Sequence, residues 1–409
     1  MLVSVISGIV LSAPYLVPVI FLVEYPEIVG KILALLFVLP LLIFLVPVRL
    51  PVKYERVQPL MRFDERDNLL SRRTLQPGSG RYDDYYERHP DKKEPDDIFR
   101  SKPGLLKAGS KYYDPVLFGA AISIFDKVDE LHPRVEGEPN ILKSPVDPKD
   151  MSDRIINMIT GWGAHSAGIT RLQDYHVYSV GGRGDRYDEV FEKQHEYAIA
   201  LTVEMDYDMM RAAPAAPTVV ESANQYLQSA LMAVQVAEFI RDLGYPARAH
   251  IDGNYKVICP LVARDAGLGE IGRMGLLMTP RLGPRVRIAV VTTDMPLEET
   301  DGFSDPTMID FCRRCEKCAL VCPGQSIPYG DEKEIGKVMR WQIHSESCYT
   351  YWCISGTDCG RCMIVCPYSH PDNWFHRMIR FGIRNSFFFR RLAIRMDDFF
   401  YGKKPSSKK

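Results

Sequence analysis

Nine of the ten cysteines lie in one short segment, residues 312–366, and their spacing suits metal binding. The first run reads Cys312-x2-Cys315-x2-Cys318-x3-Cys322-Pro323. Bacterial ferredoxins use this spacing: three thiolates bind one four-iron cluster, and the fourth binds a second cluster. A disulfide framework is not expected, because such frameworks belong mostly to short secreted chains that are rich in cysteine throughout.

A second cysteine run reads Cys359-x2-Cys362-x3-Cys366-Pro367. It lacks a first cysteine at the usual spacing, so Cys348 or Cys353 must supply that ligand from upstream. Crossed ligation then predicts one cluster on Cys312, Cys315, Cys318 and Cys366. It predicts a second cluster on Cys322, Cys359, Cys362 and one of Cys348 or Cys353. A pair of zinc sites is the weaker interpretation, because zinc prefers separated cysteine pairs.

Two low-potential clusters form an electron-transfer chain, and such a chain must deliver its electrons to a second centre. The sequence has no Gly-x-Gly-x-x-Gly dinucleotide motif. The segment Gly267-Leu-Gly-Glu-Ile-Gly-Arg273 is rich in glycine but has a different spacing. Glycines of this kind let a backbone approach a flat ligand closely.

The elements expected to position these residues begin near Met151, where globular patterning starts. Residues 197–203 and 286–292 are predicted to be buried strands, and Ser222–Leu243 is predicted to be an amphipathic helix that ends at Gly244. Strands alternating with helices predict an α/β or α+β domain. The preceding residues 50–150 are rich in charge and proline, and we expect them to form a solvated wrapping segment.

Two uncharged apolar runs lie near the N-terminus, at Leu2–Val23 and Ile32–Val48. A membrane-spanning helix needs about 20 apolar residues, so the runs predict a transmembrane hairpin, with a pair of buried core helices as the alternative. A signal peptide is disfavoured, because no basic residue precedes the first run. Basic residues follow the second run, which places the catalytic domain on the cytoplasmic side of the inner membrane. These residues are Arg49, Lys53, Arg56 and Arg62.

The formal net charge of −1 gives no general attraction to nucleic acid, and no nucleic-acid partner is expected. The C-terminal residues 373–409 are basic and aromatic. A helix of this composition either lies on anionic lipid or packs across the protein, and the sequence does not decide between them.

From about Ala164 to Gly402, the chain resembles the cobalamin-dependent reductive dehalogenases. The resemblance rests on stretches that occur in a fixed order: Tyr197-Ala-Ile-Ala-Leu-Thr-Val-Glu-Met-Asp206 with Ala213-Pro214, Phe239-Ile-Arg-Asp-Leu-Gly-Tyr245, Ala266-Gly-Leu-Gly-Glu-Ile-Gly-Arg273, Thr293-Asp-Met-Pro-Leu297, Gly356-Thr-Asp-Cys-Gly-Arg-Cys-Met-Ile-Val-Cys-Pro367 and Asp397-Asp-Phe-Phe-Tyr-Gly402. Single stretches are not specific, but the ordered set is.

The resemblance implies a nitroreductase-like corrinoid-binding domain beside a ferredoxin-like domain with two 4Fe–4S clusters. It also implies base-off cobalamin with no protein histidine on cobalt. The sequence agrees, because the Asp-x-His-x-x-Gly motif is absent and His176 stands in the nearest match, Asp174-Tyr-His-Val-Tyr-Ser179. We interpret His176 as an ordinary residue of the domain. The implied activity is reductive dehalogenation of a small organohalide.

The site residues that the resemblance implies are a tyrosine proton donor and a cation beside it. Tyr226 matches the tyrosine, with Tyr245 as a competitor that looks structural, and Arg273 matches the basic position. The resemblance favours Cys348 over Cys353 as the upstream cluster ligand. The residues expected to contact the corrinoid are Asn254, Gly267, Gly269, Glu270 and Gly272.

Five regions follow: a transmembrane hairpin at 1–49, a polar extension at 50–150, a corrinoid-binding catalytic domain at 151–305, a ferredoxin-like domain at 306–372 and a basic aromatic tail at 373–409. Typical members of the resembled family are exported by a twin-arginine signal and anchored by a small partner. This chain departs from them, because it carries its own predicted hairpin. The electron donor is unidentified, and a ferredoxin, a flavoprotein or a quinol-linked protein would each serve.

Two other functions compete with dehalogenation. An epoxyqueuosine reductase-like enzyme shares the corrinoid and the two clusters, but it would need a basic surface for tRNA, and this chain has no room for the helical repeats that usually follow the clusters. A membrane-bound ferredoxin-type electron carrier would leave the domain from Met151 to Pro306 without a purpose.

Overall fold

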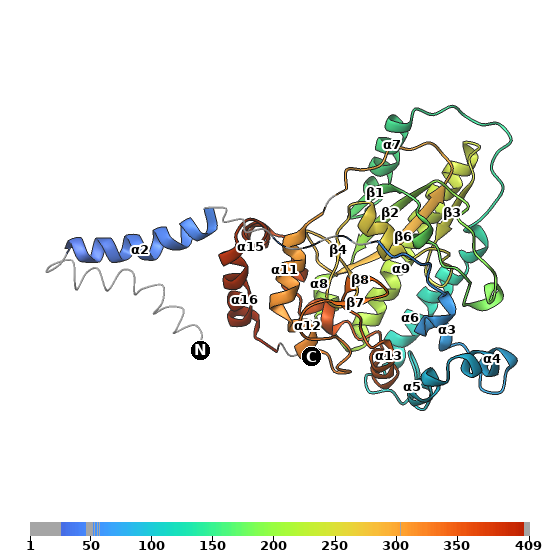
Figure 1. Ribbon diagram of the computed structural model, residues 1–409, viewed down its shortest axis with the longest axis horizontal. Coiled ribbons are helices and arrows are strands. Elements are labelled where there is room, and N and C mark those ends of the chain that lie inside the picture. Colours follow the sequence, from blue (N-terminus) through green and yellow to red (C-terminus); the bar gives the residue numbers. More distant parts are fainter. Residues whose placement is uncertain are drawn as a thin grey trace.

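The computed structural model describes residues 26–45, 52, 54, 56, 58–302 and 304–404. Most of these residues form one body of mixed helices and strands, and α2 (Pro26–Leu45) extends from one end of it (Figure 1). A mixed α/β fold was predicted, and the structure confirms it.

The centre of the body is a four-stranded sheet in the order β1-β2-β6-β3, and every neighbouring pair is antiparallel. The strands are β1 (Ser166–Arg171), β2 (Tyr197–Glu204), β3 (Ala247–His250) and β6 (Val286–Thr293). The two strands predicted from the sequence are β2 and β6, and they lie side by side in the middle of the sheet. Central strands are the most apolar, which is why the sequence pattern found them.

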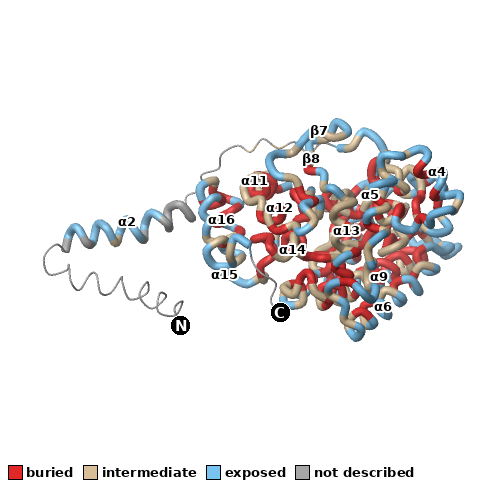
Figure 2. Tube along the Cα trace, turned by 90° about the horizontal axis from the view of Figure 1, so that it is seen from below, coloured by how far each residue is buried: buried red, intermediate tan, exposed pale blue. Residues whose placement is uncertain are grey.

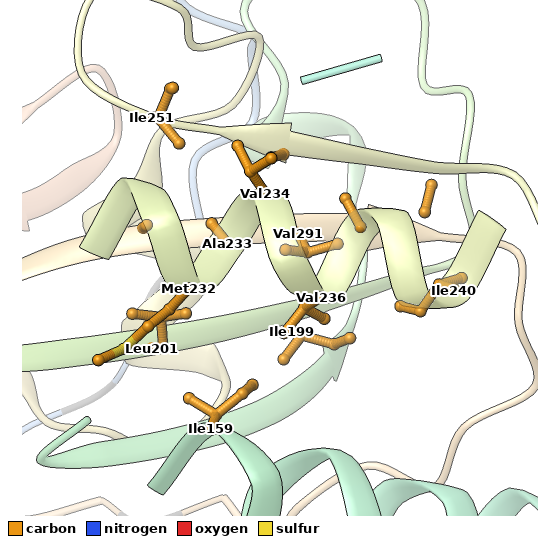
Figure 3. Packing of buried hydrophobic residues seen from close by; sticks show 14 of the residues in the cluster. Ile159, Ile199, Leu201, Met232, Ala233, Val234, Val236, Ile240, Ile251 and Val291 are labelled. Atoms are coloured by element: carbon orange, nitrogen blue, oxygen red, sulfur yellow. The ribbon is translucent and has the colours of Figure 1, made fainter. Parts of the chain in front are cut away.

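Helices cover both faces of this sheet. On one face lie α6 (Pro115–Asp129), α7 (Pro148–Gly161) and α9 (Ala216–Asp242), and on the other lies α10 (Cys259–Asp265). Figure 3 shows Met232 and Val236 of α9 packed beside Ile199 and Leu201 of β2. Ala198 and Ala200 point to the opposite face, as strand alternation requires.

The predicted helix at 222–243 is confirmed as α9, which begins earlier, at Ala216. It ends where expected, because Gly244 adopts a left-handed conformation with φ of +85°. A Cβ atom at Gly244 would lie 2.6 Å from the carbonyl oxygen of Leu142, so a side chain is excluded there.

The described residues between 58 and 150 wrap around the domain, but the prediction that residues 50–150 are solvated is wrong for part of them. They form α3 (Leu69–Arg72), α4 (Gly80–Arg88), α5 (Pro90–Arg100) and α6. Arg72 is 1% exposed and forms ion pairs with the fully buried Asp96 at 3.2 Å and with Glu346 at 2.9 Å. A hydropathy pattern cannot show that two charged residues are buried as an ion pair, so the sequence indicated only that these residues are polar.

Much of the cysteine-rich region lies at the end of the body nearer α2, while its helix α13 (Ser345–Ser355) lies farther along the body beside α5 (Figures 1 and 2). Its helices are α11 (Pro306–Cys315), α12 (Lys317–Val321), α13 (Ser345–Ser355), α14 (Arg361–Ile364), α15 (Trp374–Asn385) and α16 (Phe387–Tyr401). Short hairpins join β4 (Glu270–Ile271) to β5 (Leu277–Met278) and β7 (Lys333–Ile335) to β8 (Val338–Arg340). One further short helix, α8 (Tyr207–Met210), precedes α9, and single 3₁₀ turns lie at Glu65–Asp67, His132–Arg134, Asp174–His176, Gly184–Arg186 and Pro367–Ser369.

Among the helices that the structure describes, none combines the length and the apolar character needed to cross a membrane. The first predicted run, Leu2–Val23, lies outside the described residues. Much of the second run falls within α2, whose first turns carry the exposed pair Glu27 and Lys31, 4.0 Å apart.

Candidate active site and cluster-binding region

The first cysteine run folds into two short helices joined by a tight turn. Cys312 and Cys315 lie in α11 and Cys318 lies in α12, while Glu316 between the helices has a left-handed φ of 52°. The turn reverses the chain and brings the three thiols to one side of the loop. A similar turn occurs in the second run, where Cys359 has a φ of 61°.

The structure brings Cys366 of the second run to the three leading cysteines of the first run. Its thiol interacts electrostatically with those of Cys312, Cys315 and Cys318. Burial, followed by these neighbouring thiols, raises the pKa of Cys366 well above its usual value. This is the grouping that crossed ligation predicts for one cluster.

A second group of thiols surrounds Cys362. Its electrostatic neighbours are Cys359, Cys348 and Cys322, together with Cys318 of the first group. The backbone N–H of Ser326 also donates to the sulfur of Cys322 at 3.3 Å. The second group therefore contains Cys348, one of the two upstream candidates.

Cys353 lies elsewhere, although it shares α13 with Cys348. Its neighbours are Tyr349 and Arg73, and it packs in a small apolar cluster with Leu69 and Phe99. Five positions along a helix turn a side chain well away from the starting direction, so the two cysteines of α13 face different surroundings.

The chemistry of these thiols fits iron–sulfur clusters. Burial raises the pKa of Cys318, Cys348 and Cys359 to about 12 in each case, so the thiols stay protonated unless a metal replaces the proton. No group of three or more His, Cys, Asp or Glu side chains within the described ranges is gathered around a point that would suit one metal ion. In a four-iron cluster, each thiolate binds a different iron.

Tyr226 lies on the half of α9 nearest the second thiol group. It is half-buried, and the guanidinium of Arg287 lies over its ring, 4.5 Å from the ring centroid. Phe125 packs nearby, with ring centroids 6.1 Å apart. Burial raises the pKa of Tyr226 to about 12, and the charge of Arg287 acts against this rise.

Arg287 comes from β6 and is fixed by two further side chains. It forms an ion pair with Asp358 at 2.8 Å and donates to the hydroxyl of Ser222, which in turn donates to Asp358. Burial raises the pKa of Asp358, and Arg287 opposes the increase. Since Asp358 directly precedes Cys359, the network connects the phenol of Tyr226 to the second thiol group.

Two buried polar atoms of this network have no hydrogen-bond partner within the described residues, namely Asp358 Oδ1 and Arg287 Nε. Unsatisfied buried polar atoms are costly in a finished site. The side chains of Tyr255, Asp252 and Arg183 are further electrostatic neighbours of Tyr226. The arrangement fits a bound ligand that carries polar groups around an apolar ring, as a corrinoid does.

Arg273 is not part of this network. It is fully buried and donates to the carbonyl oxygens of Cys312 at 3.0 Å and Gly330 at 2.6 Å, and its guanidinium lies 4.8 Å from the Trp341 ring centroid. None of its described interactions involves Tyr226. Contrary to our expectation, the structure therefore does not bring Arg273 beside Tyr226. The cation that lies beside Tyr226 is Arg287. The sequence did contain a signal for Arg287, because it is a charged residue within the otherwise apolar segment 286–292 that was predicted to be a strand.

The glycine-rich loop is held by contacts within the protein. A Cβ atom at Gly269 would collide with the carbonyl oxygen of Met278, and one at Gly272 would lie 2.7 Å from Met278 Cγ. Glu270 is fully buried and accepts hydrogen bonds from the Tyr54 hydroxyl at 2.7 Å and from Arg56 at 2.6 Å. Gly267 follows α10 with a φ of +80°. Their contact with a corrinoid stays a prediction.

Three other residues named from the sequence have clear surroundings. The carboxamide oxygen of Asn254 accepts from Arg248 at 2.6 Å. His176 is fully buried between Asp265, at 2.8 Å, and the backbone N–H of Gln173, at 3.1 Å, which fits a structural role. The hydroxyl of Tyr245 donates to a carbonyl oxygen of Ser144, at 2.9 Å.

Comparison with known proteins bears on the cluster region and on the fold. The sequence model of the 4Fe-4S dicluster domain matches residues 311–370, which confirms the prediction of two 4Fe–4S clusters. The tetrachloroethene reductive dehalogenase of Sulfurospirillum multivorans is 34% identical over 210 residues, which is 50% of this chain and 41% of that protein.

Solved structures of reductive dehalogenases have a similar fold. The catabolic reductive dehalogenase NpRdhA, in complex with 3-bromo-4-hydroxybenzoic acid, has a TM-score of 0.68 at 24% identity and covers 87% of this chain. A second reductive dehalogenase, described with a mechanism for B12-dependent dehalogenation, has a TM-score of 0.64 at 27% identity and covers 76% of the chain. The resemblance to reductive dehalogenases is thus confirmed. The chain spans 41% of the Sulfurospirillum protein and 48% and 46% of the two solved chains.

Proposed function

We propose that this protein is a corrinoid-dependent reductive dehalogenase that replaces a halogen of a small organohalide by hydrogen. The observation that carries the proposal is the phenol of Tyr226 beneath Arg287, which is ion-paired to the residue before Cys359. A proton donor, a cation and a cluster-binding loop are thereby joined in one buried network. The sequence and fold similarities support the same reaction class.

When bound, the corrinoid supplies a strongly reducing cobalt centre for removing the halogen, and the clusters supply the electrons. The residues of the chain handle the proton. Tyr226 keeps its proton throughout the neutral pH range, because its pKa is about 12. Arg287 stabilises the phenolate that remains after the proton has moved to carbon, and water then returns a proton to it. Asp358 and Ser222 hold Arg287 in place.

The ligand assignment is part of the proposal. We assign Cys312, Cys315, Cys318 and Cys366 to one cluster. We assign Cys322, Cys348, Cys359 and Cys362 to the other. The electrostatic neighbours of Cys366 and Cys362 support both groupings. Because Asp358 joins Cys359 to the Arg287 network, the second cluster is the one nearer the corrinoid.

Substitution of Arg287 distinguishes the two arginines. Arg287→Gln should lower turnover at least tenfold, since each unit by which the phenol pKa rises costs about 1.4 kcal/mol. Iron content should stay at the wild-type value, and turnover is normalised to bound cobalt. Arg273→Gln serves as the comparison, and it should instead lower the iron content, because the carbonyls of the Cys312 loop lose their donors. Full turnover in Arg287→Gln would return the assignment to Arg273.

The reaction class is tested by its substrates. Purified protein, reduced by methyl viologen, should release halide from at least one member of a panel of chlorinated and brominated alkenes and phenols. It should leave an epoxyqueuosine-containing tRNA unchanged. Conversion of the tRNA without any halide release would contradict the proposal, and loss of both activities would favour an electron carrier.

Attachment to the inner membrane through the N-terminal region, with the catalytic domain on the cytoplasmic side, is also part of the proposal. Its support is the pair of uncharged runs and the basic residues that follow them. A green fluorescent protein fused after Lys409 should therefore fluoresce, and an alkaline phosphatase fused at the same place should be inactive. An active phosphatase fusion would place the domain on the other side.

A further inference from the structure

The last two helices, α15 and α16, expose several aromatic side chains together with arginines. On α15, an outward stripe repeats at helical spacing and consists of Trp374, Arg377, Met378, Phe381 and Arg384. Trp374 is 75% exposed and Arg384 is 58% exposed. Residues three and four positions apart share one face of a helix, so these five side chains form a continuous strip.

A second strip of the same kind runs along α16. Its members are Phe388, Arg391, Leu392, Arg395 and Phe399. Phe399 is 80% exposed, and Phe400 extends the exposed aromatic surface beside it. We refer to the ten residues of the two strips as the C-terminal platform.

The opposite faces of the same helices are buried, so the orientation of the platform is fixed by packing. Ile383 of α15 and Phe389 and Ala393 of α16 pack in a core that includes Cys312 and Cys366. Arg390 forms a 2.8 Å ion pair with Asp310 of α11. The platform therefore lies on the outside of the helices that cover the first thiol group.

The surface next to the platform, on helix α2, also exposes apolar side chains. Helix α2 contacts α16 and extends from the same end of the body (Figures 1 and 2). It exposes further aliphatic side chains, among them Ile32, Leu35 and Leu36. An apolar surface of this extent is unusual for a face that meets only water.

We propose that the C-terminal platform lies on an anionic lipid bilayer, with its aromatic side chains in the interfacial layer and its arginines on lipid phosphates. Four of the arginines in these helices, Arg377, Arg384, Arg391 and Arg395, are exposed on the platform, whereas Arg380 and Arg390 are buried, so the exposed charge of the platform is complementary to anionic lipid. Exposed Trp and Phe alternating with Arg along one helical face is the composition of interfacial helices.

The position of the platform also indicates which part of the protein faces the membrane. The platform helices cover a core that contains Cys312, Cys318 and Cys366 of the first group, with Cys322 and Cys362 of the second group packed against it, so the cluster-binding region as a whole faces the proposed bilayer. An electron donor that resides in the membrane would meet the protein on this side.

Quenching of Trp374 fluorescence tests the contact directly. Full-length holoprotein is mixed with vesicles of phosphatidylcholine and phosphatidylglycerol whose acyl chains carry bromine, a short-range quencher. We expect lower tryptophan emission than with unbrominated vesicles of the same composition. The difference should disappear in Trp374→Phe. It should persist in Trp162→Phe, because Trp162 is 41% exposed but follows α7 at the far side of the body (Figure 1).

The role of charge is tested with a matched pair of double variants. Arg391→Gln with Arg395→Gln should weaken partitioning onto the anionic vesicles about 25-fold, or about fivefold for each arginine. Arg154→Gln with Arg171→Gln removes two exposed arginines from α7 and β1 and should leave partitioning unchanged. Equal emission with both kinds of vesicle, or equal partitioning of the two double variants, would overturn the proposal. The platform would then be covered by residues 1–25 or by another protein.

Discussion

Replacing Cys348 by alanine should remove the iron of one cluster, whereas replacing Cys353 should leave both clusters in place. Cys348 lies with Cys322, Cys359 and Cys362, and its thiol has a pKa raised to about 12 by burial. A cluster that loses one of its four thiolates loses an iron ligand that no nearby group replaces. Turnover should fall to background, because the cluster nearest the corrinoid is incomplete.

Cys353→Ala is a matched control, since both cysteines lie on α13. Cys353 is buried among Leu69, Phe99 and Tyr349, so its replacement removes only a small amount of packing. A loss of about 1 kcal/mol of stability is expected, with full iron content. Iron per chain and turnover are measured for both variants. If Cys353→Ala lost the iron of one cluster while Cys348→Ala kept both clusters, the upstream cluster ligand would be Cys353 and not Cys348.

Tyr226→Phe should lower dehalogenation by about 10²–10⁴-fold, the range that a general acid typically contributes. Only one hydroxyl is removed, and the aromatic contacts with Phe125 and the guanidinium of Arg287 remain. Cobalt and iron contents should therefore be those of the wild type. The measurement is halide release driven by methyl viologen, normalised to bound cobalt.

Tyr245→Phe provides the control for this substitution. It removes a hydroxyl that donates to the Ser144 carbonyl at 2.9 Å, far from the Arg287 network. It should cost about 1 kcal/mol of stability and leave turnover nearly unchanged. If Tyr226→Phe retained full turnover with full cofactor loading, another group would deliver the proton, and Tyr226 would be a packing residue of α9.

The cluster region was predictable from the sequence because its ligands are local. The spacing within each cysteine run sets the turns at Glu316 and Cys359, and these turns do not depend on distant parts of the chain. The strands β2 and β6 and the helix α9 were predictable for a similar reason, since each is a long apolar or periodic segment. The grouping of Cys366 with the first run follows from a known ligation pattern and not from spacing alone.

The cation beside Tyr226 was not predictable in the same way. Tyr226 and Arg287 are 61 positions apart and meet only because α9 packs against β6. The sequence showed a glycine-rich loop ending in Arg273, which made that arginine conspicuous, but Arg273 contacts the Cys312 loop and not Tyr226. Residues 50–150 were misjudged for a related reason: the ion pair of Arg72 with Asp96 buries two charges that look solvent-exposed in a sequence.

The metal content of the purified protein tests the central claim most directly. The full-length chain is produced without oxygen in the presence of cobalamin, and cobalt and iron are measured on the same sample. The account predicts about one cobalt and about eight irons per chain, from one corrinoid and two four-iron clusters. Full iron with no cobalt, despite an ample supply of cobalamin, would contradict it and would leave a two-cluster protein without the centre that its buried tyrosine is proposed to serve.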